Sequence, residues 1–161
     1  GGDVAVKDTD ILKLAVVERH KMTGNIGRGL FKGYGFKGGA MGITIAHDSH
    51  NIILLGDDNA AMAKAGNVLK EIGGGMVIVE SSGKVHSLTL DIGGLMSSRD
   101  AESLQRDSKA IIERAYAMGV DRRLEAFMSL AFLSLAVIPK LKLVDKGLFD
   151  VEKFAFTNIE A

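Results

Sequence analysis

Short apolar runs alternate with polar and glycine-rich stretches along the chain, a pattern typical of strands and amphipathic helices joined by turns. Nearly continuous apolar runs of strand length predict buried strands. These runs are ILKLAVVE at 11–18, AMGITIA at 40–46, NIILLG at 51–56 and GGMVIVES at 74–81. After the last run, Ser82-Gly83 predicts a turn into a partner strand, KVHSLTL at 84–90.

Two segments instead show the three- to four-residue spacing of an amphipathic helix. The first covers 62–72, and Asp57-Asp58 ahead of it can cap a helix. The second covers 104–118 and follows Ser97 and Asp100, which have the spacing of a capping box. A glycine follows each segment, so both helices are expected to end there.

The C-terminal part is harder to assign, because the segment 124–137 is apolar throughout and shows no clear period. It is read as a buried helix, followed by a turn around Lys146-Gly147 and a final short strand. The elements predict one compact domain of α/β or α+β class, with amphipathic helices packed on a mixed β-sheet. Residues 1–9 are expected to be an N-terminal tail or a remnant of an expression tag, and residues 10–161 the domain.

Charge and composition exclude several classes of partner. The 20 basic and 20 acidic residues cancel, which leaves no net attraction to nucleic acid or to an anionic membrane. The longest apolar stretch, 127–139, is too short to span a bilayer. The chain has no cysteine, which is compatible with a reducing cytoplasm. We therefore expect a cytoplasmic protein that binds neither nucleic acid nor a membrane.

Two of the four histidines lie in the stretch HDSHN, His47 to Asn51, between two predicted strands. No H-E-x-x-H motif and no cysteine pair accompany His47 and His50, which disfavours a metal site. Neighbouring residues on an extended chain point to opposite sides, so this stretch cannot relay a proton within itself. The favoured interpretation is a polar or partner-facing turn, in which Asp48, Ser49 and Asn51 bond to nearby backbone groups.

A polar triplet, Glu18, Arg19 and His20, ends the first predicted strand and adjoins a long glycine-rich stretch. A strand end beside a flexible loop fits a ligand site, and it fits a solvated strand end equally well. The glycine-rich stretch is interpreted as a flexible connection, mobile or docked on a partner. Its glycines include Gly24, Gly27, Gly29, Gly33 and Gly35. The G-x-G-x-x-G match at 33–38 leads into a predicted strand, unlike a dinucleotide site.

Several stretches, taken in order, resemble the C-terminal domain of bacterial and archaeal adenine deaminases. The resemblance runs from about Leu12 to Phe156. Its specific parts are ERHKMTG at 18–24, AHDSHN at 46–51, EIGGGMVIV at 71–79, IGGLMS at 92–97 and AVIPKLKLVDKGLFD at 136–150.

This resemblance implies part of an amidohydrolase that converts adenine and water to hypoxanthine and ammonia in purine salvage, a hydrolase acting on a cyclic amidine C–N bond. It implies manganese or iron bound by histidines of a (β/α)8 barrel, for which this chain has no room because such a barrel takes about 250 residues. No cofactor, metal ligand or catalytic residue is therefore expected within the chain, which should be inactive alone. The implied partners are the barrel, in the same polypeptide or subunit, and further copies in a homo-oligomer.

The residues expected to face the substrate or the barrel are those of the two polar stretches: Glu18, Arg19, His20, His47, Asp48, His50 and Asn51. A different class of function stays open beside this one. The chain could be a free-standing module that binds a purine or a nucleotide, or one that builds an oligomer.

Overall fold

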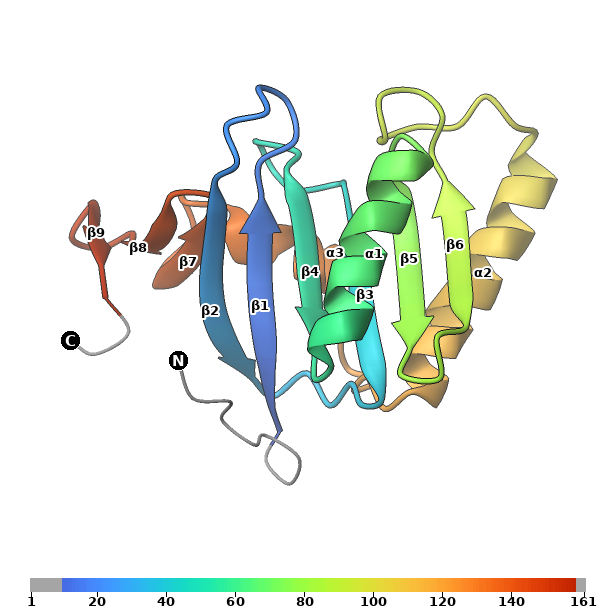
Figure 1. Cartoon of the computed structure of the whole chain (residues 1–161), viewed down its shortest axis with the longest axis horizontal. Helices are drawn as coiled ribbons and strands as arrows, with labels where there is room; N and C mark the ends of the chain where they lie inside the picture. The colour runs from blue at the N-terminus through green and yellow to red at the C-terminus, as the bar shows by residue number, and fades with distance from the viewer. Residues whose placement is uncertain (1–9, 159–161) are drawn as a thin grey trace.

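The computed structural model describes residues 10–158, which form two antiparallel sheets and three α-helices (Figure 1). The main sheet has six strands in the order β2-β1-β4-β3-β5-β6, and a smaller sheet has the order β7-β8-β9. Every pair of neighbouring strands in these sheets is antiparallel. Of the two predicted classes, α/β and α+β, the fold is α+β, and the expected packing of helices on a sheet is confirmed.

The elements have the following bounds. The main sheet consists of β1 (Ile11–Val17), β2 (Ile26–Lys32), β3 (Gly39–Ile43), β4 (Ile52–Gly56), β5 (Gly75–Glu80) and β6 (Val85–Thr89). The helices are α1 (Asn59–Glu71), α2 (Ala101–Ala117), α3 (Met128–Ala131) and the 3-10 turn η1 (Phe132–Ser134). The small sheet consists of β7 (Leu141–Val144), β8 (Gly147–Asp150) and β9 (Ala155–Thr157).

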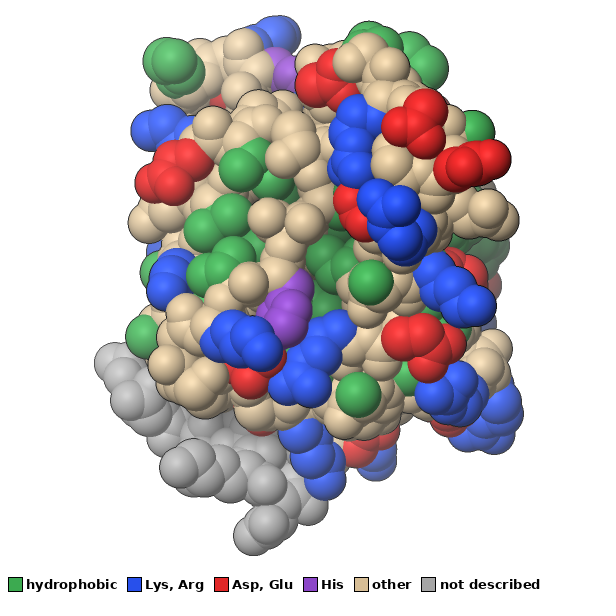
Figure 2. All heavy atoms as spheres, turned by 90° about the vertical axis from the view of Figure 1, so that its right-hand side faces the viewer, with side chains coloured by type: hydrophobic (Ala, Val, Ile, Leu, Met, Phe, Trp, Pro, Cys, Tyr) green, Lys and Arg blue, Asp and Glu red, His purple; other side chains and the backbone are tan. Residues whose placement is uncertain are grey.

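At β4 the main sheet is covered on both faces, because every residue of this strand is buried and successive side chains point to opposite faces. Leu54 packs with α1 residues in one apolar cluster, whereas Ile53 and Leu55 belong to a larger cluster with α2 and α3. Helix α1 lies over β3, β4 and β5 (Figure 1). Beyond β6, the side of the molecule formed by β6 and α2 carries charged side chains of both signs (Figure 2).

The helix starts follow from carboxylate caps. Asp58 caps α1, because its side chain accepts from the amides of Ala60 and Ala61 at 2.8 and 3.1 Å. Asp100 caps α2 by accepting from the amide of Ser103 at 2.8 Å. The capping-box role expected of Ser97 is therefore wrong, because the residue three positions later is itself the cap.

The buried helix expected over 124–137 is also wrong in extent, since only α3 and η1 form there. Side chains form hydrogen bonds with the backbone groups that would pair with each other in a longer helix. The hydroxyls of Tyr116 and Tyr34 donate to the carbonyls of Leu124 and Ala126, and the amide of Met128 donates to the Glu125 carboxylate. The segment is nevertheless buried in the main core, as its apolar composition requires.

The glycine-rich stretch is not one continuous loop, because residues 26–32 form β2 and pair with β1. Two of its glycines face the small sheet. A Cβ on Gly27 would lie 1.8 Å from the carbonyl oxygen of Val144, and one on Gly29 would lie 3.5 Å from the Leu143 side chain. Gly27 therefore permits close approach of β7 rather than flexibility. The mobility expected of the stretch remains a prediction.

Candidate functional site

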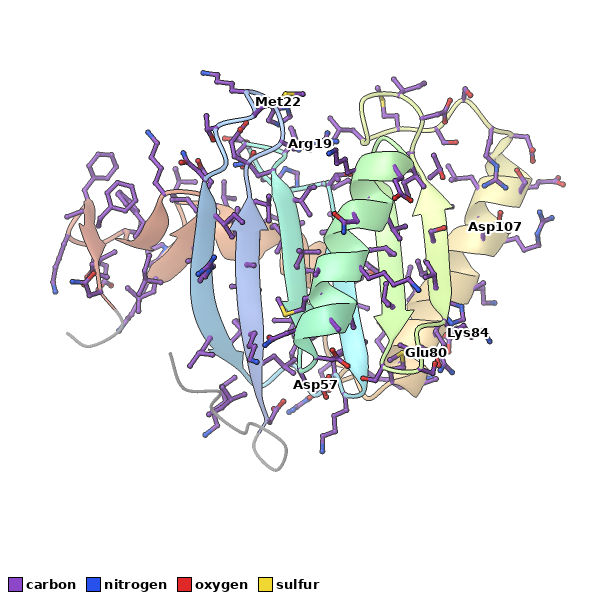
Figure 3. All side chains as sticks on the ribbon, in the orientation of Figure 1. Arg19, Met22, Asp57, Glu80, Lys84 and Asp107 are labelled. Carbon is purple, nitrogen blue, oxygen red and sulfur yellow. The ribbon has the colours of Figure 1, made fainter. Side chains whose placement is uncertain are left out.

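One end of the main sheet gathers four loops around a single guanidinium group. Arg19 lies just beyond β1, below a loop whose tip carries Met22 (Figure 3). Its Nε donates to the carbonyl of His50 at 2.8 Å, Nη2 to Gly93 at 2.6 Å, and Nη1 more weakly to Gly73 at 3.4 Å. The β1–β2 loop is thereby tied to the β3–β4 turn, the α1–β5 turn and the β6–α2 loop. We call this end of the molecule the Arg19 cluster.

The charge of Arg19 is met by carbonyl dipoles. Within residues 10–158, no carboxylate lies at ion-pair distance from its guanidinium. Burial lowers the pKa of Arg19 from its usual value, although an arginine stays protonated at neutral pH. The planar guanidinium suits this place, because its donors diverge toward three separate loops.

Thr44 and a pair of glycines complete the base of the cluster. The buried Thr44 hydroxyl accepts from the amide of Gly75 at 2.8 Å and donates to the carbonyl of Gly94 at 2.6 Å. A Cβ on Gly94 would lie 2.7 Å from Arg19 Nη1, and one on Gly74 would lie 2.6 Å from the Gly94 Cα. Both glycines have positive φ, so a side chain is excluded on two grounds. Sequence reasoning missed these residues, although a threonine inside an apolar strand was a usable signal.

The stretch HDSHN forms a compact turn between β3 and β4. The amide of His50 donates to the carbonyl of Ala46 at 2.6 Å, and the Ser49 hydroxyl accepts from the amide of Asn51 at 3.4 Å. His50 has a positive φ of 50°, the left-handed region that a polar turn residue adopts. His47 packs on a neighbouring element instead, with its ring centroid 5.2 Å from that of Phe132 in η1.

Glu18 organises the loop that follows β1. Its carboxylate accepts from the amides of His20, Lys21 and Thr23 at 2.5, 2.8 and 3.1 Å, and from the Thr23 hydroxyl at 3.0 Å. These bonds, the Thr23 amide foremost, lower the pKa of Glu18 to about 2. A carboxyl with so low a pKa is ionised at neutral pH and is unsuited to donate a proton.

The structure thus brings together some of the predicted site residues and separates others. Arg19 and His20 both reach the HDSHN turn, since His20 Nε2 donates to the carbonyl of Ser49 at 2.8 Å. Asn51 is buried at the start of β4, and its side-chain oxygen has no hydrogen-bond partner among the described residues. Asp48 is solvent-exposed, and its side chain forms no hydrogen bond within residues 10–158.

The glycines expected to form one flexible loop are divided between the two ends of β2. Gly24, with a positive φ of 75°, lies in the turn before this strand, at the Arg19 cluster. Gly33 and Gly35 follow the strand and lie at the opposite end of the sheet, because β2 runs antiparallel to β1. A Cβ on Gly35 would lie 2.4 Å from the carbonyl oxygen of Gly119, so this glycine permits packing against the end of α2.

Residues 10–158 contain no group of three or more histidine, cysteine or acidic side chains that could hold a metal ion. The three histidines of the Arg19 cluster therefore do not converge as ligands. In the same residues, no helix combines the length and apolar character needed to cross a membrane. The arrangement can hold loops together and present exposed polar side chains.

Fold and site together define an α+β domain in which one arginine joins four loops at one end of the main sheet. The chain belongs to the family described as the adenine deaminase C-terminal domain, whose model matches residues 1–155.

Among similar proteins, the adenine deaminase of Nitratidesulfovibrio vulgaris (strain DP4) is 47% identical over 150 residues, which are 92% of this chain and 26% of that protein. The adenine deaminase of Listeria welshimeri is 45% identical over 148 residues, 91% of this chain and 26% of that protein. That of Bacillus subtilis (strain 168) is 42% identical over 153 residues, 95% of this chain and 26% of that protein. The chain thus spans about a quarter of the length of these curated relatives.

Proposed function

We propose that this chain is the C-terminal domain of an enzyme that hydrolyses adenine to hypoxanthine and ammonia in purine salvage in the cytoplasm. The observation that carries the proposal is membership of the adenine deaminase C-terminal domain family, together with full-length relatives named adenine deaminase. The catalytic portion belongs to the part of the enzyme that corresponds to the unmatched length of those relatives.

The reaction replaces the amino group at C6 of adenine by oxygen from water, and ammonia leaves. Metal-dependent deaminases activate this water on a bound ion. The described residues of this chain provide no ligand set for manganese or iron. We therefore assign the metal, and every bond-breaking step, to the catalytic portion, and we propose that the isolated chain is inactive.

The proposal gives the Arg19 cluster a positioning role. Arg19 and Glu18, both half-buried, form hydrogen bonds to the backbone of the loops. His20 and Asp48 are exposed, and His47 is half-buried at the surface. A set of hydrogen-bonded loops that presents imidazoles suits a surface facing the substrate or the catalytic portion. Loss of such a positioning contact lowers the rate while metal content stays unchanged.

The test uses a joined enzyme, in which this chain replaces the part of Nitratidesulfovibrio vulgaris adenine deaminase that it matches. Hypoxanthine formation from adenine is followed with manganese present, for the joined enzyme and for the isolated chain. We expect turnover from the joined enzyme only. Metal-dependent turnover by the isolated chain, or a folded and metal-loaded joined enzyme without activity, would contradict the proposal. Calorimetric binding of adenine to the isolated chain would instead support a free-standing purine-binding module.

A further inference from the structure

Within residues 10–158, one half of a sheet face has no helix or loop packed over it. Helix α1 packs on β3, β4 and β5, and it leaves the same face of β1 and β2 open (Figure 1). Ile26 and Leu30 of β2 lie on this open face and are 45% and 52% exposed. A sheet face that keeps large aliphatic side chains in water is typical of an interaction surface.

Basic side chains are interleaved with these aliphatic ones. Arg28 and Lys32 alternate with Ile26 and Leu30 along β2, and Lys13 lies opposite Leu30 on β1. Strands β1 and β2 contain no acidic residue. Lys13 Nζ donates to the Asn59 side chain at 2.8 Å, and none of the three cations forms an ion pair within residues 10–158. We call this set the β2 surface: Lys13, Ile26, Arg28, Leu30 and Lys32.

The backbone of β2 is open at the same place. The amide of Glu18 donates to the carbonyl of Asn25, and that of Gly33 donates to Asp10, each at 3.1 Å. These bonds fix the ladder so that odd-numbered residues of β2 bond to β1. The backbone groups of Ile26, Arg28, Leu30 and Lys32 therefore point outward, at the edge of the main sheet. Side chains and free backbone groups of the same residues thus serve one surface.

A groove lies on the other side of this edge strand, toward the small sheet. Its volume is about 540 Å³, and it lies between Leu30 and Phe31 on one side and Leu141 and Lys142 on the other. Leu141 is itself exposed. Apolar residues therefore lie on both sides of the edge strand, although Asp150 and Lys153 also line the groove.

We infer that the β2 surface is the docking site for the catalytic portion of the enzyme, and that the docking face of that portion is apolar and acidic. The inference rests on the proposed function, because most of the length of each relative lies outside the part that matches this chain. Charge selects this occupant over a second copy, since two β2 surfaces facing each other would oppose cation to cation. An acidic partner would neutralise Arg28 and Lys32 and exclude water from Leu30.

The experiment uses the joined enzyme with a protease site placed before residue 10. After cleavage, the two parts are separated by size exclusion at increasing salt. We expect the two unaltered parts to stay together. Leu30→Glu and Arg28→Glu should each raise the dissociation constant of the two parts by about tenfold or more. Val85→Glu is the matched control, because Val85 is an exposed residue on β6, at the opposite edge of the sheet. Melting temperatures of the variants in the isolated chain exclude unfolding as the cause.

Equal retention of all variants, or separation of the unaltered pair at low salt, would overturn the inference and would show that Arg28 and Lys32 merely protect an exposed edge strand. Dimerisation of the isolated chain that Leu30→Glu abolishes would also overturn it, in favour of a second copy. Adenine turnover by the uncleaved enzyme is measured in parallel. If the enzyme is active but its two parts separate whether or not Leu30 is changed, the docking site alone is contradicted. If the enzyme is inactive but association of its two parts requires Leu30, the proposed function alone is contradicted.

Discussion

The two edges of the main sheet differ in how their exposed groups are satisfied. At the β6 edge, Glu80 joins His86 of β6 and Arg114 of α2, with N–O distances of 2.6 and 2.8 Å. Further ion pairs lie along α2, and the surface there alternates in sign (Figure 2). At the β2 edge, Arg28 and Lys32 have no ion-pair partner among residues 10–158 and lie beside exposed aliphatic residues.

The two edges therefore differ in whether their charged side chains are paired within residues 10–158. The Glu80 carboxylate accepts from both His86 and Arg114, and the hydrogen bond from His86 is the main cause of its lowered pKa. These contacts connect α2 to β5 and β6, so the charged side chains at the β6 edge are paired within the domain. Within residues 10–158, the β2 edge lacks both an ion-pair network and a covering helix, which is typical of an interaction surface.

The largest effect on stability is expected from Gly27→Ala, which would disrupt the packing of β7 against β2. The new Cβ would meet the Val144 carbonyl oxygen, a backbone atom that cannot move without displacing β7. We expect a loss of about 2–4 kcal/mol in the free energy of unfolding, measured by urea denaturation. Gly29→Ala on the same strand is the control, because its Cβ would meet only the flexible Leu143 side chain. Equal losses for both variants would contradict this account of the small sheet.

Arg19→Lys should come next, because a lysine ammonium cannot reach the three carbonyls that the guanidinium binds. We expect the isolated chain to lose about 1–3 kcal/mol of stability. In the joined enzyme, kcat/KM should fall further than that stability loss explains. Arg28→Lys, which keeps the charge on an exposed strand, is the control and should leave stability unchanged. A kcat/KM that falls only in step with stability would make Arg19 purely structural.

How far the sequence predicts this molecule depends on whether the signal is local. Helix α1 and its cap at Asp58 were predictable because spacing and capping act within a few residues. Strand β2 was not, since Gly27 and Gly29 remove the apolar pattern and the strand exists through its pairing with β1. At the site, sequence reasoning selected Arg19. It could not show that Arg19 binds Gly73 and Gly93, because these contacts depend on tertiary structure.

A smaller effect is expected for His47→Ala in the joined enzyme. If the imidazole faces the catalytic portion or the substrate, kcat/KM should fall by about tenfold with unchanged metal content. Phe132→Leu serves as the control, because it removes the ring that packs on His47 and keeps the imidazole. Should Phe132→Leu reduce kcat/KM as much as His47→Ala, the histidine would act through packing of the turn alone.

The smallest effect concerns acid stability at the Arg19 cluster. The pKa of Glu18 is lowered in the folded chain from 4.5 to about 2, so its contribution to stability is full above pH 4.5 and is lost as pH falls toward about 2. Glu18→Gln should therefore flatten the decrease in unfolding free energy across this window. The measurement is urea denaturation between these two pH values, with Glu71→Gln, an exposed residue at the end of α1, as the control. An unchanged slope for Glu18→Gln would contradict the loop-capping role.

The most direct test of the central claim is amide hydrogen exchange at both edges of the sheet, measured in the isolated chain and in the joined enzyme. The outward amides of 26–32 have no partner in the main sheet. We expect the amides of this segment to exchange at least about tenfold more slowly in the joined enzyme than in the isolated chain. The amides of 85–89 on the β6 edge should exchange at the same rate in both proteins. Unchanged exchange at 26–32, or protection that appears only at 85–89, would contradict the claim that the β2 edge receives the catalytic portion.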